Sequence, residues 1–505
     1  MNDSATSREW IGLAVLTLPC LLLSMDLTVL YLAVPSLSAD LGPSSAQLLW
    51  IVDIYGFLIA GSLITMVTLG DRIGRRRLLL IGAGAFSVAS TLAAFSTSAE
   101  MLIATRALLG VAGATLMPST LALIRNMFHD EAQRSTAISI WVTSFMVGSA
   151  IGPLLGGFML EHFWWGSVFL LGVPVMGLLL ILGPFLLPEN RDPNAGRLDI
   201  PSAALSLVAI LAVIYGIKRT ATNGFSGEAV LAIAAGLAIG FVFVLRQRKL
   251  QDPIMDLDLF RVAAFRTSVG TQLVALIAMA GAYFYTVQYL QLVVGLDPLP
   301  AGLWLIPSTI AGMGGSMFAP VLARRFRPAY VMSAGLIMGA IGFAMVTLVG
   351  GNWGVAVLIP AFVIMSVGIS ATMTVTTDLI VGVAPPERAG AASAISETSS
   401  ELGLALGIAI IGSIGTAVYR RDMVNAIPAG VPSEAADAAR DTLGSALAVA
   451  ARLPGEIGTD LAELARSAFT HALHSTAMTG AAILVALAIV VVLTLKQVPP
   501  RSSSV

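Results

Sequence analysis

Long apolar stretches separated by short polar segments run along the whole chain, a pattern typical of a protein that crosses a membrane many times. A helix that spans a bilayer needs about 20 mostly apolar residues, and the sequence holds fourteen such stretches. They cover roughly residues 11–34, 48–69, 78–97, 101–124, 136–160, 167–187, 200–217, 228–245, 267–290, 300–323, 329–349, 354–380, 390–418 and 475–495. The pattern therefore predicts an all-α membrane protein with 14 transmembrane helices.

Two features recur in the two ends of the chain and indicate an internal duplication. The segment GDRIGRRR follows the second span, and ARRFRP follows the tenth. Glycines of the fifth span recur at the same intervals in the thirteenth, although chance spacing in a glycine-rich chain is an alternative explanation. We predict a six-span half over 1–190, two inserted spans over 191–262, and a second six-span half over 263–505. A site between duplicated halves is typical of transporters.

The region at about 419–474 is a polar insert before the last span. An alanine-rich stretch over 433–452 predicts a helix that Pro454 and Gly455 end, and apolar residues at helical spacing predict another helix over 460–474. We expect an external helical hairpin, with a disordered insert as the alternative.

Lysine and arginine concentrate in the loops on one side of the predicted membrane, and both termini fall on that side. Loops rich in Lys and Arg stay in the cytoplasm. We therefore expect a multi-pass membrane protein with both termini cytoplasmic. By this count the short external loops hold only Lys218 and Arg219.

The composition excludes a soluble globular class, because 57% of the residues are hydrophobic and only 11% are charged, whereas soluble domains have about 25% charged residues. With a net charge of −1 and no basic patch, we expect no nucleic-acid partner. The four histidines lack metal-ligand spacing, and no nucleophile–base set is present, so we expect no metal, no catalytic residues and no enzyme. We expect a monomer.

Four carboxylates lie inside apolar stretches: Asp26, Asp53, Glu397 and Glu401. A charge in a bilayer core costs at least about 2.5 kcal/mol, so such residues usually face a protein interior or a water path and carry function. Only Arg106 lies at comparable depth by sequence. The predicted interior is thus rich in negative charge, which suits protons or cationic cargo.

Arg106, Asp26 and Asp53 all fall in the outer half when depth is counted along the helices. Arg106 is therefore a predicted partner of one of these acids, with a purely structural ion pair as the alternative. Glu397 and Glu401 are four residues apart and share one helix face. Like charges so close resist simultaneous ionisation, which favours one retained proton.

Aromatic side chains in the spans are candidates for stacking on planar cations, with plain packing as the alternative. The candidates are Tyr31, Tyr55, Phe57, Phe145, Tyr285 and Tyr289.

The fifth span contains GSAIGPLLGG. Its first three glycines are spaced four residues apart on one helix face and allow a neighbouring helix to approach closely. This pattern resembles the antiporter motif of drug-exporting members of the major facilitator superfamily. The resemblance is carried by Gly148, Gly152, Pro153, Gly156 and Gly157.

The segment GDRIGRRR resembles the superfamily signature between spans 2 and 3, although Val67 and Gly70 replace its usual glycine and alanine. The matching residues include Asp71, Arg72, Gly74 and Arg75. The resemblance implies that Asp71 pairs across to basic groups and latches the closed cytoplasmic face, with a purely topological role for the arginines as the alternative.

The first span, MDLTVLYLAVP, resembles that of fourteen-span drug:proton antiporters, with Tyr31 where asparagine is usual. The resemblance extends over nearly the whole chain and implies a major facilitator fold and a location in a bacterial inner (plasma) membrane. It also implies alternating-access export of quaternary ammonium compounds, dyes such as ethidium, and fluoroquinolones. The expected partners are cationic and amphiphilic small molecules, protons and the lipid bilayer, with a proton gradient in place of a cofactor. Export of a native lipid or metabolite is the alternative function.

Overall fold

The computed structural model describes residues 5–189, 191, 199–224, 226–250, 257–350, 354–384, 389–427 and 431–499. Every regular element in these ranges is a helix. By length and composition, 14 of the helices are able to cross a membrane. The predicted all-α membrane fold with fourteen spans is therefore confirmed.

The helices of the first half and of the insert are α1 (Ser7–Leu41), α2 (Ser45–Ile73), α3 (Arg75–Ala94), α4 (Ala99–Met127), α5 (Glu131–His162), α6 (Ser167–Leu170), α7 (Gly172–Leu186), α8 (Ile200–Asn223) and α9 (Gly227–Gln247). Those that follow are η1 (Leu257–Arg261), α10 (Ala263–Gln288), η2 (Tyr289–Val293), α11 (Pro298–Arg325), α12 (Pro328–Val346), η3 (Gly354–Val357), α13 (Leu358–Val383), α14 (Ala389–Ala426), α15 (Ser433–Asp441), α16 (Leu443–Ala450) and α17 (Gly455–Leu495).

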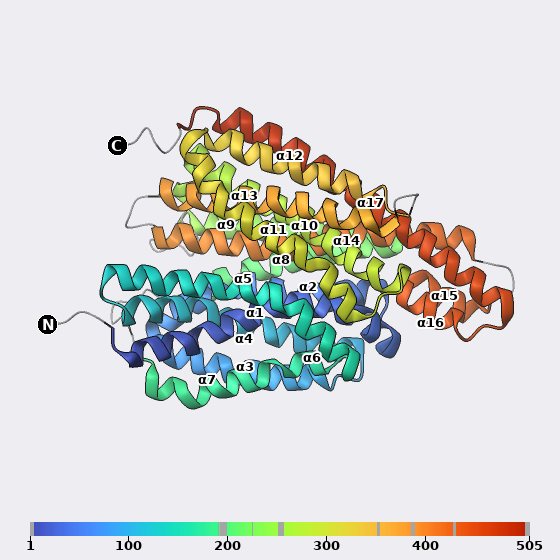
Figure 1. The fold of residues 1–505 in the computed structure, drawn as a ribbon, viewed down its shortest axis with the longest axis horizontal. Helices are drawn as coiled ribbons and strands as arrows, with labels where there is room; N and C mark the ends of the chain where they lie inside the picture. The colour runs from blue at the N-terminus through green and yellow to red at the C-terminus, as the bar shows by residue number, and fades with distance from the viewer. Residues whose placement is uncertain are drawn as a thin grey trace.

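Two helix bundles lie side by side, with α1–α7 in one and α10–α14 with α17 in the other (Figure 1). Equivalent pairs pack in each bundle: α1 lies along α5 as α10 lies along α14, and α3 lies along α4 as α12 lies along α13. The bundles touch through α2 with α14 and through α5 with α11. The two ends of the chain lie at the same end of the molecule (Figure 1).

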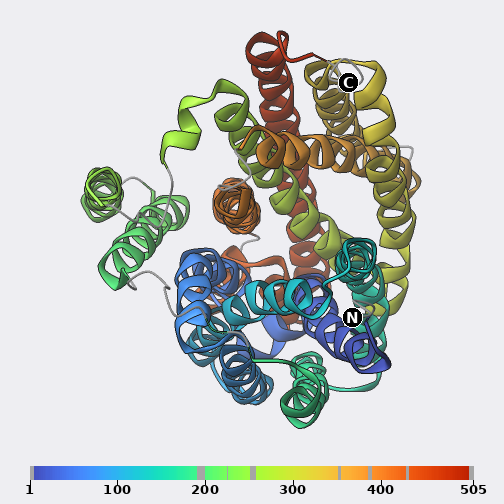
Figure 2. The same cartoon turned by 90° about the vertical axis from the view of Figure 1, so that its left-hand side faces the viewer.

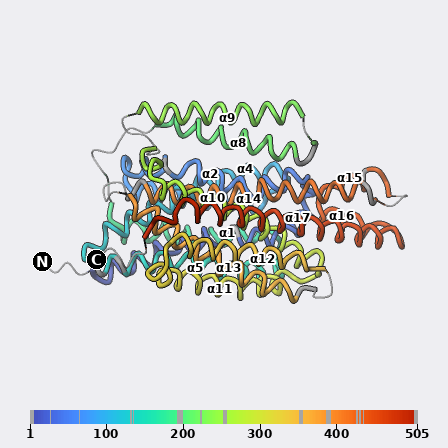
Figure 3. Tube along the Cα trace, turned by 90° about the horizontal axis from the view of Figure 1, so that it is seen from above, coloured from blue at the N-terminus to red at the C-terminus, as the bar shows by residue number. Residues whose placement is uncertain are grey.

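The inserted helices α8 and α9 stand at the side of the two bundles (Figures 2 and 3). α8 packs on α2 of the first half and on α14 of the second, and α9 packs on α8. The placement of Lys218 in an external loop was wrong, because α8 continues to Asn223 and Lys218 is a buried helical residue.

The insert before the last span is helical, but its first helix is divided. Thr442 has extended backbone angles (φ −144°, ψ 155°), and its side chain accepts a hydrogen bond from the Ser445 amide, so α15 ends there and α16 begins. The second helix begins at Gly455 rather than near residue 460 and continues without a break into the last span as α17.

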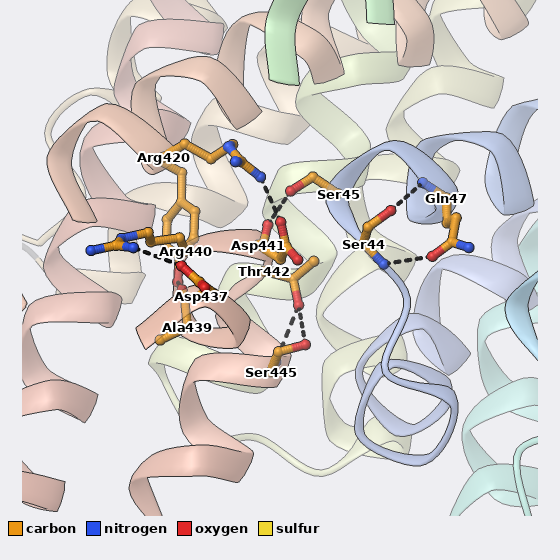
Figure 4. A network of polar contacts seen from close by, with 11 residues as sticks. Ser44, Ser45, Gln47, Arg420, Asp437, Ala439, Arg440, Asp441, Thr442 and Ser445 are labelled. Atoms are coloured by element: carbon orange, nitrogen blue, oxygen red, sulfur yellow. Dashed lines mark hydrogen bonds and ion pairs between the residues drawn. The ribbon is translucent and has the colours of Figure 1, made fainter. Parts of the chain in front are cut away.

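Polar contacts fasten this hairpin to both halves (Figure 4). The Ser45 hydroxyl of α2 donates to the Asp441 carbonyl. Arg420 Nη1 of α14 lies 2.5 Å from Asp441 Oδ1, and the Tyr419 hydroxyl donates to the Ala439 carbonyl at 2.9 Å. The hairpin thus joins the two halves at the end of the molecule away from the chain termini.

Candidate functional site: a central cavity and its buried charges

A cavity of about 360 Å³ lies between the two halves. Its volume is at the lower end of the range usual for small-molecule pockets. Helices α1, α2, α4, α5, α10, α11 and α14 all contribute to its wall. The lining residues are Leu23, Ser24, Thr28, Tyr31, Tyr55, Ile59, Met117, Phe145, Ser149, Met279, Ala280, Tyr283, Thr309, Glu401 and Leu404.

Aromatic rings form much of the cavity wall. The rings of Tyr31 on α1 and Tyr283 on α10 lie 5.5 Å apart between centroids, so an aromatic pair bridges the two halves. Phe145 on α5 is held by an edge contact with Trp141, and Tyr55 lies on α2. Three of the six candidate aromatics, Tyr31, Tyr55 and Phe145, therefore face the cavity.

The other three candidates lie elsewhere. Phe57 packs against Ile214 where α2, α8 and α14 meet. Tyr285 stacks on Phe469 below the hairpin and donates to the Gly412 carbonyl at 3.2 Å. Tyr289 is a buried residue of η2.

Tyr283 was not among the candidates, although its spacing from neighbouring residues in the sequence could have indicated its position. It lies four residues after Met279 and three after Ala280, and all three line the cavity. Residues at these spacings share one helix face, whereas Tyr285 faces another direction on the same helix.

Glu401 is the one acid of the four predicted that lines the cavity. It lies on α14 among apolar and hydroxyl-bearing neighbours. Glu397 is one turn away on the same helix and is partly buried, but it is outside the cavity lining. Hydroxyls of Ser24, Thr28 and Ser149 supply polar groups on the opposite wall.

Asp26 forms an ion pair with Arg106 inside the first half. Arg106 Nη1 lies 2.5 Å from Asp26 Oδ2, and the Arg106 side chain is fully buried. Arg106 Nε also donates to the Ile51 carbonyl at 3.2 Å, and its guanidinium carbon lies 4.6 Å from the centre of the Tyr55 ring. Tyr55 therefore contacts both this pair and the central cavity.

Asp53 forms an ion pair with Lys218, a partner that the sequence analysis missed. Lys218 Nζ lies 2.8 Å from Asp53 Oδ1 and also 2.8 Å from Oδ2, and both side chains are almost fully buried. The ammonium also lies 3.7 Å from the centre of the Trp50 ring. The expectation that Arg106 is the only base at this depth was therefore wrong.

These pairings change the charge balance of the interior. Arg106 and Lys218 neutralise Asp26 and Asp53, so the remaining acids of the set are Glu397 and Glu401. A buried carboxylate is stable only when it is paired or protonated, and none of the residues that line the cavity with Glu401 is basic.

The loop between α2 and α3 is fastened within its own half. Asp71 Oδ1 lies 2.5 Å from Arg75 Nη2, across the break between α2 and α3, whereas Arg72 is exposed. Gly74 has a φ of +110°, and an added Cβ there would lie 2.4 Å from the Glu189 carboxylate at the end of the first half. The pairing of Asp71 observed here is thus local rather than across the halves.

The glycines of α5 allow close helix contacts of two kinds. Gly148, Gly152 and Gly156 face α1, and a Cβ at Gly148 would lie 2.3 Å from the Leu21 carbonyl oxygen. Gly157 faces the second half, where its Cβ would lie 2.6 Å from the Leu299 Cα. Pro153 lies beside the same contact, because its carbonyl oxygen would lie 2.5 Å from a Cβ at Gly302.

Equivalent glycines of α14 make the corresponding contacts. A Cβ at Gly403 would lie 2.9 Å from the Leu273 carbonyl oxygen of α10, and one at Gly407 would lie 2.6 Å from that of Ile277. Gly412 faces Leu49 of the first half. The spacing that recurs in the sequence thus corresponds to a recurring packing arrangement.

The duplicated bundles, the fourteen spans and the cavity between the halves define a multi-pass membrane transporter. The family model for the Major Facilitator Superfamily matches residues 17–408. The chain belongs to this superfamily, so it is a transporter and not an enzyme.

Two relatives that match nearly the whole chain are an efflux pump and a resistance protein. The chain is 45% identical to the multidrug efflux pump LfrA of Mycolicibacterium smegmatis, over 96% of both chains. It is 34% identical to the methyl viologen resistance protein SmvA of Salmonella typhimurium, over 94% of this chain and 95% of that one.

Among solved structures, a bacterial homologue of the human lysosomal transporter Spinster in an inward-facing, unoccupied conformation superimposes with a TM-score of 0.70. The two proteins are 16% identical, and the match covers 98% of this chain and 99% of that one. This likeness supports the fold.

Proposed function

We propose that this transporter is a proton-coupled exporter of hydrophobic cations and amphiphiles that works by alternating access. The observation that carries the proposal is Glu401, a carboxylate that lines an aromatic cavity between the two halves. The names of LfrA and SmvA support a drug as cargo. The classes expected are quaternary ammonium compounds, dyes such as ethidium, and fluoroquinolones.

The chemistry of the cavity supports an exchange of cargo for a proton. A planar cation is attracted both to the faces of Tyr31, Tyr55 and Tyr283 and to an ionised Glu401. Cargo that enters therefore favours loss of the Glu401 proton. Protonation from the opposite side removes the attraction and favours release of the cargo. Glu397, one turn away, is the second group of this proposed proton site.

The distribution of basic residues supports a cytoplasmic location for both chain termini. The end of the molecule that holds the termini also holds the α2–α3 and α11–α12 junctions, beside which lie Arg75–Arg77 and Arg324–Arg327. Basic segments between spans remain on the cytoplasmic side. The hairpin of α15, α16 and the first turns of α17 is then external. This orientation makes ethidium uptake into inside-out vesicles the expected direction of transport.

The test is ethidium transport by purified protein in proteoliposomes under an imposed pH gradient. We expect accumulation that stops when the gradient is collapsed and that is lost in Glu401→Gln. Glu463→Gln is the matched control, because Glu463 is exposed on the hairpin part of α17.

Transport of ethidium that is unaffected by the pH gradient would contradict proton coupling. Failure of wild-type protein to move any cation of a drug panel would instead favour export of a native lipid or metabolite.

A further inference from the structure

A second, larger cavity lies on the outer surface of the second half, away from the transport site. It is a groove of about 560 Å³ between α11 and α12, with α13 as its floor. Apart from the Tyr330 hydroxyl, every side chain in its wall is apolar or absent. The lining residues are Ala311, Gly314, Gly315, Phe318, Leu322, Phe326, Tyr330, Val331, Ala334, Gly335, Met338, Val367, Gly368 and Ala371.

The groove is open to the surroundings of the protein. Phe318 is 69% exposed and Phe326 is 55% exposed, so their rings form a rim. Glycines remove side chains from the interior of the groove, and a Cβ added at Gly314 would meet no atom within 4 Å. Because α11 and α12 are membrane-spanning helices, the groove faces lipid.

One end of the groove carries concentrated positive charge. Its lining residues Leu322, Phe326 and Tyr330 bracket the end of α11 and the start of α12, where Arg324, Arg325 and Arg327 are exposed. Arg327 Nη1 donates to the Lys496 carbonyl at 2.7 Å, which brings a further base to the same place.

α11 and α12 contain no acidic residue, and the one acid of α13, Asp378, is not among the residues that line the groove. The sequence contains no Asp or Glu between Asp297 and Asp378. An apolar channel with a basic end is complementary to an amphiphile that has an acyl chain and an anionic headgroup. A zwitterionic lipid gains the same apolar contact but little from the arginines.

We propose that this groove binds an anionic phospholipid, with an acyl chain along α11 and α12 and the phosphate group at Arg324, Arg325 and Arg327. A basic residue near an anionic headgroup contributes roughly a fivefold gain in affinity. The apolar part of the groove supplies the chain contact that fixes the lipid at this position, and the arginines supply the selectivity for the headgroup.

The test is native mass spectrometry of the purified protein titrated with phosphatidylglycerol or with phosphatidylcholine of the same acyl chains. We expect tighter binding of phosphatidylglycerol. The triple variant Arg324→Gln, Arg325→Gln, Arg327→Gln should lose this preference, by roughly fivefold for each arginine removed. Its control is Arg248→Gln, Lys249→Gln, which removes two exposed bases at the end of α9.

A second pair of variants tests the apolar part independently of charge. Gly314→Leu places a side chain in the groove at a position where a Cβ meets no atom within 4 Å, and it should weaken binding of both lipids. Gly177→Leu on α7 is the matched control, because a Cβ there also meets no atom within 4 Å. Folding of each variant is checked by thermal unfolding.

Equal affinity for the two lipids in the wild type would overturn the proposal, as would a triple variant that keeps the preference. If Gly314→Leu binds both lipids as the wild type does, the groove is not the binding site.

Discussion

Lys218 on the inserted helix α8 and Asp53 on α2 form a buried ion pair, with Nζ 2.8 Å from each carboxylate oxygen. This contact fixes the insert to the first half, while neighbouring residues of α8 pack on α14 of the second half. The insert is therefore in direct contact with both halves of the transporter.

Removing one partner of this pair should destabilise the protein strongly. Lys218→Met leaves the Asp53 carboxylate buried without a counter-charge, and breaking such a pair costs about 3–5 kcal/mol. The double variant Lys218→Met, Asp53→Leu should recover much of this loss, because apolar replacements remove both charges. Thermal unfolding in detergent measures the differences.

Arg219→Met is the control for this prediction. Arg219 pairs with Glu228 at 3.3 Å, but both side chains are largely exposed, and exposed pairs contribute about 0–1 kcal/mol. If Lys218→Met and Arg219→Met have the same unfolding temperature, the Lys218–Asp53 pair does not stabilise the fold.

Binding of a cationic cargo should release protons through Glu401. We expect proton release to fall strongly in Glu401→Gln, and less in Glu397→Gln, because only Glu401 lines the cavity. Cargo affinity in the wild type should weaken as the pH falls, since a protonated carboxyl no longer attracts a cation. Calorimetry in buffers of different ionisation enthalpy measures the protons released. Equal release in the wild type and both variants would move the coupling to Asp26 and Asp53.

Two adjacent glycines of α5 should respond differently to substitution. Gly156 faces Val29 within the same half, so Gly156→Leu should lower stability in every conformation. Gly157 faces the Leu299 backbone of the other half, so Gly157→Leu should oppose the contact seen here while each bundle stays folded. We expect Gly157→Leu to block ethidium transport with little change in unfolding temperature. A large stability loss in Gly157→Leu alone would contradict this assignment.

The hairpin should become more stable on mild acidification because of Asp441, which lies outside the membrane spans. Burial raises the pKa of Asp441 above its usual value, although the Arg420 guanidinium opposes this shift. A carboxyl with a raised pKa in the folded state binds its proton before the unfolded chain does. Stability therefore rises as the pH falls from neutral through the folded pKa, until the unfolded chain is also protonated near pH 3.9.

Asp441→Asn should remove this pH-dependent gain and should be no less stable than the wild type at neutral pH. Unfolding temperatures at pH 7 and pH 5 test the prediction, and Asp437→Asn, at an exposed position of the same helix, is the control. A wild-type hairpin that loses stability at pH 5 would refute it.

The sequence predicted the membrane spans because each needs a long apolar run, a property of single segments. It did not predict the partner of Asp53. The apolar run over 200–217 stops just before Lys218, and only the packing of α8 on α2 shows that the helix continues and buries this lysine. A buried lysine and a lysine in a loop look alike in one sequence.

The direction in which an aromatic side chain points also depends on tertiary packing. Phe57 and Tyr55 are two residues apart on α2, so they point in different directions, and the sequence does not show which direction leads to the cavity. The acids gave a clearer signal, because a carboxylate in an apolar run is costly wherever it lies. Even so, the sequence does not show that Arg106 and Lys218 pair with two of the four acids, or that only one of the other two lines the cavity.

The helix α17 has 41 residues and is therefore about 60 Å long at 1.5 Å per residue, roughly twice the thickness of a bilayer core. It is continuous from the hairpin to the opposite membrane surface. When its membrane portion tilts, its projecting end therefore moves by a distance comparable to the movement of the membrane portion. A fluorophore placed near Gly455 would then report the conformational cycle from outside the bilayer, without any label in the transport pathway.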